Sequence, residues 1–147
     1  MTVAPTSARF NRSEWSSAFR NVDEELTDVP LKPVRGEVPD ALRGSLYRNG
    51  PGRLERDGQR VHHPFDGDGM ITALHFDAEG VRFSNRFVRT SGWKAEEATG
   101  KVLFRGVFGS QKPGGPLANA FDLRLKNIAN TRVVLSLIHI SEPTRPY

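Results

Sequence analysis

The chain has 147 residues, of which 37% are hydrophobic and 26% charged, a balance typical of a globular domain that folds in water. It contains no cysteine, which excludes disulfides, thiolate nucleophiles and zinc or iron–sulfur sites built on cysteine. Its 21 basic residues are scattered among 17 acidic ones and never form a run, so the net charge of +4 does not indicate a nucleic-acid-binding protein.

No apolar stretch reaches the length of a membrane-spanning helix, and the first residues lack the apolar core of a secretory signal. We therefore expect a cytoplasmic protein. The basic surface is compatible with peripheral contact with an anionic membrane, although the sequence shows no amphipathic anchor.

Residues 1–37 combine Pro5, Pro30 and Pro33 with mostly polar neighbours, a pattern that predicts an irregular N-terminal arm. A short helix is expected only near Ser13–Arg20, where Ser13 is a suitable N-cap. We expect the arm to lead into the folded domain without forming a domain of its own.

A first strand is expected at Ser45–Asn49, because these residues follow a proline turn and alternate in polarity. The run Gly50-Pro51-Gly52 is expected to end this strand, since glycine and proline both disfavour strand interiors. The polar residues Arg53–Val61 then predict a loop.

The run Phe65–Met70 alternates aspartate with glycine. Glycine reaches positive φ without strain and aspartate bonds nearby backbone N–H groups, so Asp66–Gly69 predicts a tight turn. The same Asp-x-Asp-Gly spacing begins calcium-binding loops, but the later oxygen ligands of such a loop are absent, and the turn is the favoured interpretation. We expect both carboxylates to accept backbone N–H bonds around the turn, and Arg86 or Arg89 to pair with one of them.

Residues 70–88 predict a β-hairpin. Met70–Phe76 and Val81–Val88 are strand-like, and the residues between them form a turn sequence. On the second strand the odd-numbered residues from 81 to 87 share one face and are expected in the core, while the even-numbered residues from 82 to 88 are expected on a wetter face.

Further along, Trp93–Gly100 predicts a short helix that ends at a glycine, Lys112–Pro116 predicts a loop, and Thr131–Val134 predicts the start of another strand. Short antiparallel strands separated by glycine and proline turns indicate an all-β fold. This pattern alone does not distinguish a sandwich, a barrel and a propeller.

The four histidines form no metal-binding pattern. His62 and His63 are adjacent, so in extended backbone their side chains point in opposite directions and cannot hold one metal ion together. His75 lies in the predicted hairpin, where a structural or surface role is favoured over ligation. His139 belongs to the C-terminal segment considered below.

Taken together, several of these runs resemble the N-terminal part of the carotenoid cleavage oxygenases, with the closest likeness to the bacterial apocarotenoid type. The resemblance covers about Val38–Val134. It is carried by the runs Phe65–Met70, Asn85–Thr90, Arg105–Ser110, Phe121–Lys126 and Asn127–Thr131.

The resemblance implies a seven-bladed β-propeller that is incomplete in this chain, which would supply the N-terminal arm and the first one or two blades. It also implies an Fe(II) ion held by four histidines. Those ligands lie beyond the end of the likeness, so we expect no catalytic, metal or cofactor-binding residue in this chain. The family's motif residues that are present are expected to be structural: His63, Phe65, Asp66, Gly67, Asp68, Gly69, Arg86, Arg89, Thr90, Asn127 and Asn130. Asn127 and Asn130 are expected to satisfy buried backbone groups between strands.

Residues 135–147 resemble no part of that family and look like a translated sequencing adapter, so a non-native tail is expected there, with a genuine edge strand as the alternative. The predicted organisation is an N-terminal arm at 1–37, a partial carotenoid oxygenase propeller domain at 38–134 and the tail at 135–147.

For the intact protein the resemblance implies Fe(II)-dependent cleavage of a double bond in an apolar carotenoid or apocarotenoid by dioxygen, giving two carbonyl products. A stilbene-cleaving dioxygenase of the same family is the first alternative. A non-catalytic β fragment is the second, and it is the expectation for the 147-residue chain itself. Because missing blades would leave a strand edge along Met70–Phe76 or Val81–Val88 unpaired, we expect the chain alone to aggregate or stay partly unfolded.

Overall fold

A computed structural model describes residues 17, 19–120, 122 and 124–134. Most of the helix predicted near Ser13–Arg20 and the whole tail at 135–147 lie outside the described residues.

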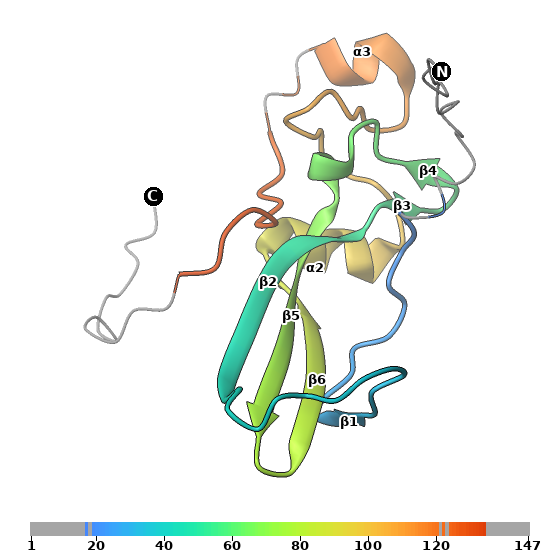
Figure 1. Cartoon of the computed structure of the whole chain (residues 1–147). Helices are drawn as coiled ribbons and strands as arrows, with labels where there is room; N and C mark the ends of the chain where they lie inside the picture. The colour runs from blue at the N-terminus through green and yellow to red at the C-terminus, as the bar shows by residue number, and fades with distance from the viewer. Residues whose placement is uncertain (1–16, 18, 121, 123, 135–147) are drawn as a thin grey trace, which may run out of the picture.

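The main sheet contains four antiparallel strands in the order β1-β6-β5-β2 (Figure 1). These strands are β1 (Val29–Leu31), β2 (Gly44–Arg53), β5 (Asp68–Asp77) and β6 (Gly80–Phe87). A second sheet pairs β3 (Glu55–Arg56) with β4 (Gln59–Arg60). The helices are the 3₁₀ turn η1 (Pro64–Asp66), α2 (Ser91–Thr99) and α3 (Gly115–Ala120). The described chain is mostly strand with few helical residues, so the predicted all-β class is confirmed.

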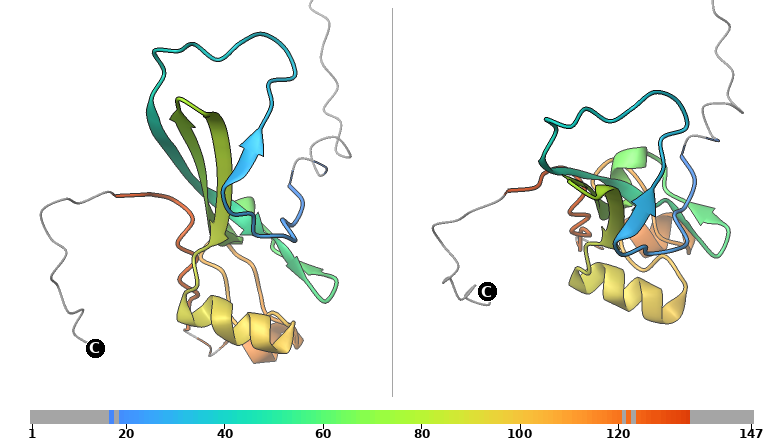
Figure 2. Two further views of the ribbon diagram at one scale, coloured as in Figure 1. Left: turned by 90° about the horizontal axis from the view of Figure 1, so that it is seen from below. Right: turned by 60° about the horizontal axis from the view of Figure 1, so that its bottom comes forward.

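The helices gather at one end of the sheet, and the other ends of β5 and β6 extend away from them (Figures 1 and 2). The buried apolar residues follow this division, because Leu54, Met70 and Phe87 all lie toward the helical end. The molecule therefore has its core at one end of its sheet.

The predicted hairpin is confirmed, with β5 and β6 in register from Met70 opposite Phe87 to Asp77 opposite Gly80. On β6 the predicted core face is most buried near α2, where Asn85 is 4% and Phe87 8% exposed. The chain at residues 24–26 also packs there: the Asn85 side chain accepts a bond from Leu26 N and donates one to Glu24 O, and Phe87 N donates to Glu25 Oε1.

The predicted helix at residues 93–100 is confirmed as α2. Thr90 caps it by accepting a bond from Trp93 N at 3.1 Å, which satisfies one of the free N–H groups of the first turn. Gly100 ends it in the left-handed conformation, with φ of 67°.

The predicted end of the first strand at residues 50–52 is wrong, because β2 runs through this segment to Arg53. Pro51 is tolerated because β2 is an edge strand and a bulge follows it, where the register shifts between Pro51 and Arg53. Gly52 is required by close packing, since a Cβ there would lie 2.6 Å from Met70 Cβ.

Four further elements differ from the sequence prediction. The predicted loop at 53–61 contains the β3–β4 hairpin, the predicted irregular arm contributes β1, and α3 begins inside the loop predicted at 112–116. Residues 131–134 form no strand. The edges of the main sheet are β1 and β2, so the prediction that the hairpin strands 70–76 or 81–88 would form an open edge is also wrong.

Candidate functional site

The turn at residues 64–69 is fixed by side chains from distant parts of the chain. Asp66 is 3% exposed, and its carboxylate accepts bonds from Phe108 N at 2.8 Å and Ser110 N at 3.1 Å. Asn130 donates from its Nδ2 to Phe65 O and Gly67 O, both at 2.8 Å. The turn is therefore bonded on both sides, to the loop that contains Phe108 and to the segment that contains Asn130.

The glycines of the turn act differently from the sequence prediction, which relied on positive φ. Gly67 has φ of −69° and Gly69 is not among the residues with positive φ. What both positions need is space: a Cβ on Gly67 would lie 2.7 Å from Leu54 Cδ2, and a Cβ on Gly69 would lie 2.1 Å from Ala129 O. Glycine is thus required here because neighbouring groups pack directly against the backbone.

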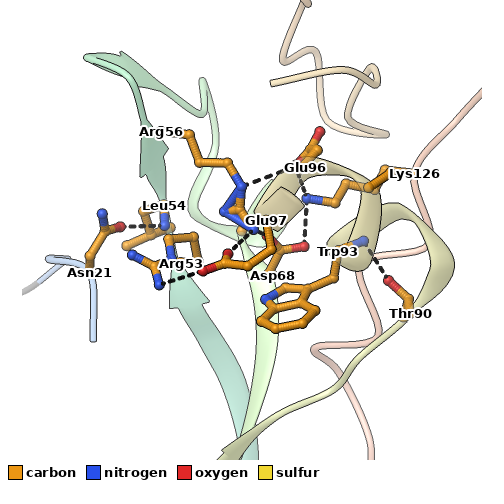
Figure 3. Close-up of polar contacts among 12 residues, drawn as sticks. Asn21, Arg53, Leu54, Arg56, Asp68, Thr90, Trp93, Glu96, Glu97 and Lys126 are labelled. Carbon is orange, nitrogen blue, oxygen red and sulfur yellow. Dashed lines mark hydrogen bonds and ion pairs between the residues drawn. The ribbon is translucent and has the colours of Figure 1, made fainter. Parts of the chain in front are cut away.

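Behind the turn lies a buried charge cluster of Arg56, Asp68, Glu96 and Lys126 (Figure 3). All four side chains are at most 8% exposed. Lys126 Nζ lies 2.5 Å from both Asp68 Oδ1 and Glu96 Oε2, and Arg56 Nη2 lies 3.0 Å from Asp68 Oδ2. Two cations and two carboxylates balance, which is the condition for burying charge without a large penalty.

Glu96 also bonds backbone outside the cluster, because its Oε1 accepts from Leu103 N at 2.9 Å and Phe104 N at 3.2 Å. The next residue, Glu97, is 43% exposed and pairs with Arg56 and with Arg53 at the edge of the cluster. Glu96 is thus buried and bonds the backbone of the loop at residues 103–104, whereas Glu97 remains in contact with solvent.

Burial raises the pKa of Asp68 above its ordinary value, although Lys126 and Arg56 act in the opposite direction. The nearby carboxylate of Glu96 adds to the increase. The cavity beside the cluster has a volume of about 30 Å³, far below the several hundred Å³ of a typical organic ligand pocket. The space next to Asp68 and Glu96 is therefore too small for an organic ligand.

A second group of residues, the aromatic cluster of His63, Phe65 and Phe108, lies on the outer side of the turn. Ring centroids are 5.0 Å apart for His63 and Phe65, 5.1 Å for His63 and Phe108, and 5.7 Å for Phe65 and Phe108. Phe65 is 56% and Phe108 48% exposed, and neighbouring Val107 is 55% exposed. This is an apolar surface whose backbone is fixed from behind by Asp66 and Asn130.

The expected pairing of Arg86 or Arg89 with an aspartate of the turn is wrong. Arg86 donates to Thr27 Oγ1 at 2.8 Å, and Arg89 lies 2.6 Å from Glu25 and over the ring of Trp93. Both arginines therefore hold the N-terminal arm against the sheet. The expectation that both aspartates accept bonds from the turn's own backbone is wrong as well, because Asp66 bonds the loop at 108–110 and Asp68 pairs with Arg56 and Lys126.

The remaining candidates are dispersed. Asn127 is exposed, whereas Asn130 is 6% exposed and bonds the turn backbone as described. His75 bonds Ser45 Oγ through Nδ1 at 2.7 Å on the sheet surface. Among residues 17, 19–120, 122 and 124–134 no three histidine, cysteine or acidic residues lie close enough together to hold a metal ion.

Arg56, Glu96 and Lys126 were not predicted from the sequence. The hairpin that carries Arg56 had a signal, because Asp57-Gly58 is a favoured pair for a two-residue turn, and both residues have positive φ, 49° and 72°. Nothing in the sequence connects Glu96 or Lys126 to Asp68, from which they are separated by many residues.

Comparisons with known proteins agree on one relationship. The family model of the retinal pigment epithelial membrane protein matches residues 19–147, a range that includes the segment predicted to be a non-native tail. The chain is 47% identical over 133 residues to apocarotenoid-15,15'-oxygenase of Synechocystis, covering 90% of this chain and 27% of that protein. It is 32% identical over 147 residues to isoeugenol monooxygenase of Pseudomonas nitroreducens, covering 95% of this chain and 29% of that protein.

Solved structures give the same result. A glutamate-to-glutamine variant of the Synechocystis apocarotenoid oxygenase matches with a TM-score of 0.76 and 48% identity, over 82% of this chain and 25% of that one. A cobalt-substituted form of the Synechocystis protein matches with a TM-score of 0.75 and 50% identity, over 80% of this chain and 25% of that one. The chain thus spans about a quarter of the length of these relatives. The predicted fold, the N-terminal part of a β-propeller that is incomplete in this chain, is confirmed.

Within the part of the chain that the structure describes, no helix is long and apolar enough to cross a membrane.

Proposed function

Because the chain belongs to the carotenoid oxygenase family of the retinal pigment epithelial membrane protein, we propose that it is the N-terminal part of an Fe(II)-dependent oxygenase that cleaves a carotenoid or apocarotenoid. The intact enzyme would split one double bond of the polyene with dioxygen and release two carbonyl products. The observation that carries the proposal is 47% identity to an apocarotenoid-15,15'-oxygenase over nearly the whole chain.

We assign iron to the part of the intact protein that lies outside the described residues. The described residues supply no cluster of three ligands, so they do not fit a role in holding the metal. The cobalt-substituted relative supports a metal-dependent family without identifying the metal of this protein.

The described region would serve the reaction by contacting the substrate. Phe65, Val107 and Phe108 expose an apolar surface, and a polyene offers only apolar groups and π-electrons for recognition. Asp66 and Asn130 fix the backbone beneath this surface, so the rings would meet the substrate without a large loss of conformational entropy.

A stilbene-type substrate is the second candidate within the family. It is supported by the match to isoeugenol monooxygenase, whose named substrate has, like a stilbene, a double bond conjugated to an aromatic ring. The first candidate is preferred because the identity to the apocarotenoid enzyme is higher, 47% against 32%. The alternative from another class is that the 147-residue chain is a non-catalytic β fragment. We infer that this holds for the isolated chain and that the intact protein is the enzyme.

The remaining assignments follow from the same proposal. Residues 38–134 belong to the propeller domain, residues 1–37 form its N-terminal arm, and residues 135–147 are a non-native tail. The intact protein is cytoplasmic and takes up its apolar substrate by peripheral contact with a membrane.

A chimera tests the proposal. Residues 19–134 of this chain replace the matching quarter of the Synechocystis apocarotenoid-15,15'-oxygenase, and cleavage is measured with an apocarotenal and with isoeugenol. Cleavage of the apocarotenal to two carbonyl products is expected. A chimera that is folded and loaded with iron but cleaves only isoeugenol would favour the second candidate, and one that cleaves neither would contradict the proposal. The isolated 147-residue chain, assayed with added Fe(II), is the control and is expected to be inactive.

A further inference from the structure

His63 occupies an unusual position in the aromatic cluster. It is the N-cap residue of η1, with extended backbone at φ of −123° and ψ of 138°, and its Nδ1 accepts a hydrogen bond from Phe65 N at 3.1 Å. Pro64 follows at the first position of the turn, where its fixed φ and missing N–H are favourable. The His63 side chain thus determines how the chain enters the turn that carries Phe65.

A cap alone does not call for histidine. Serine, threonine, aspartate and asparagine are the residues that cap helical turns best, because a short side chain places its oxygen directly over the free N–H groups. Histidine offers in addition a flat ring, and here that ring contacts both phenylalanines, stacked on Phe108 with an interplanar angle of 29° and edge-on to Phe65 with an angle of 66°. The combination of one acceptor and one ring face is what distinguishes His63 from an ordinary cap.

The hydrogen bond from Phe65 N also determines which ring nitrogen carries the proton when the imidazole is neutral. Since Nδ1 accepts a hydrogen bond from a backbone N–H, it carries no proton, and the neutral ring must carry its proton on Nε2. A doubly protonated imidazole has no acceptor and would lose the bond to Phe65 N.

The backbones of both phenylalanines are held independently of His63. Phe108 N is bonded to Asp66, and Phe65 O is bonded to Asn130. These bonds fix where the two side chains begin, and they leave the orientation of the exposed rings to their neighbours. The two rings contact each other edge-on, and His63 contacts both of them, so it is in a position to fix the orientation of the pair.

We propose that His63 is a positioning residue: its imidazole caps the turn through Nδ1 and packs against both Phe65 and Phe108, and so fixes the two rings in the orientation that contacts an apolar, polyene-type substrate. The substrate part of this inference rests on the proposed function. The positioning part stands on the geometry of this chain alone.

Three substitutions separate the two contacts. His63→Asn keeps an acceptor for Phe65 N and removes the ring, His63→Phe keeps a ring and removes the acceptor, and His63→Ala removes both. His62→Ala is the matched control, because His62 is the adjacent histidine, its side chain is exposed, and its bond to Ser110 is made by its backbone N.

The first readout is NMR of the 147-residue chain labelled uniformly with ¹⁵N and ¹³C, repeated on the chimera. We expect the His63 ring to show the neutral form protonated on Nε2, with cross-relaxation between its ring protons and those of Phe108. His63→Asn should preserve the slow exchange of the Phe65 amide and lose the fixed orientation of the two rings. His63→Phe should preserve the ring orientation and lose the slow exchange of the Phe65 amide. A proton on Nδ1, or unchanged Phe65 and Phe108 signals in His63→Ala, would overturn the proposal.

The second readout is cleavage of an apocarotenal by the chimera. We expect KM to rise about 5-fold in His63→Ala and by less in the two partial variants, the size expected when one cap or one ring contact is lost, while kcat changes little. The control His62→Ala should match the unsubstituted chimera. A KM for His63→Ala equal to that of the control would contradict a role in substrate contact. A folded chimera that cleaves no apocarotenal even with His63 intact would defeat the proposed function, and the NMR result would still decide whether His63 positions the rings.

Discussion

The two ends of the sheet are built on different principles. At one end, the locked region consists of η1, the first residues of β5, α2, and residues 103–110 and 124–130, which are joined by buried polar contacts. At the other end, the open region consists of residues 29–31, 44–48, 72–77 and 80–84. The locked region pairs its buried charges within the described chain and exposes apolar side chains at Phe65, Val107 and Phe108, whereas the exposed apolar side chains of the open region lie in rows across the sheet.

The register of the strands shows that the open region has one apolar face and one polar face. Directly opposed residues of antiparallel strands share a face, so Leu46, Leu74, Phe83 and Val29 form one row across the sheet. A second row contains Phe76, Val81 and Leu31. Leu46 is 49% and Leu31 43% exposed, and the opposite face carries Ser45, His75 and Arg82. Such a face is normally packed against another layer. We infer that the buried polar contacts of the locked region are made within the described residues, whereas the apolar face of the open region requires protein from outside them.

The largest expected effect is in the buried charge cluster. Glu96→Ala leaves Lys126 and Arg56 with one buried carboxylate and removes the acceptor for Leu103 N and Phe104 N, so we expect a loss of about 3–5 kcal/mol in the free energy of unfolding. Glu97→Ala, at the next and 43% exposed residue, should cost at most about 1 kcal/mol. Urea unfolding followed by far-UV circular dichroism measures both. Equal losses in the two variants would show that burial of Glu96 does not increase its contribution to the free energy of unfolding.

A smaller effect is expected where backbone packs on backbone. Gly69→Ala places a Cβ 2.1 Å from Ala129 O, so the segment at 128–130 must move, and we expect a loss of about 1–3 kcal/mol in the free energy of unfolding. Gly50→Ala is the control in the neighbouring strand, since a Cβ there meets no atom within 4 Å. The same urea titration applies, and a Gly69 variant as stable as the Gly50 variant would contradict the close approach.

Asp68 should make the stability of the locked region depend on pH in the acid range. Burial raises its pKa in the folded state, so its protonated form is favoured by folding and this contribution is fully present below the unfolded pKa. The contribution is lost as pH rises through the raised folded pKa. As pH rises, the free energy of unfolding of the unsubstituted chain should therefore fall relative to that of Asp68→Asn. A rise in the free energy of unfolding of the unsubstituted chain relative to the variant would mean that Lys126 and Arg56 affect the pKa of Asp68 more than burial does.

The smallest effect on stability is expected in the open region. Leu46→Lys replaces a half-exposed leucine on the apolar face, so the free energy of unfolding should change by no more than about 0.5 kcal/mol. Self-association should decrease, because the apolar face is interrupted by a charge. Sedimentation velocity checks this, with Ser45→Lys on the opposite face as the control. Equal self-association of both variants would show that the apolar face is not the contact surface.

The sequence predicted what short-range patterns determine. The β5–β6 hairpin follows from alternation around a turn, and α2 from its capping residues, because both depend on neighbours along the chain. β2 was predicted too short because Pro51 ends a central strand but is tolerated at an edge, and edge position is a property of the whole sheet.

The candidate site was predicted only in part for the same reason. The motif Asp66–Gly69 was located correctly, but the residues that bond Asp66 and the turn backbone, which are Phe108, Ser110 and Asn130, lie 42 residues away or more. Its glycines proved to be needed for close approach of Leu54 and Ala129 and not for positive φ. Contacts at this separation leave no pattern in a single sequence.

Hydrogen exchange of the 147-residue chain, read peptide by peptide at low protein concentration, tests the contrast between the two regions most directly. We expect the amides of Gly69, Leu103, Phe108 and Ser110 to exchange only through global unfolding, since each is bonded to a distant part of the locked region. Residues 44–48 and 72–84 should exchange through openings of lower free energy. Equal protection in both regions, together with a sharp monomeric melting transition, would contradict the conclusion that the open region needs further protein to complete it.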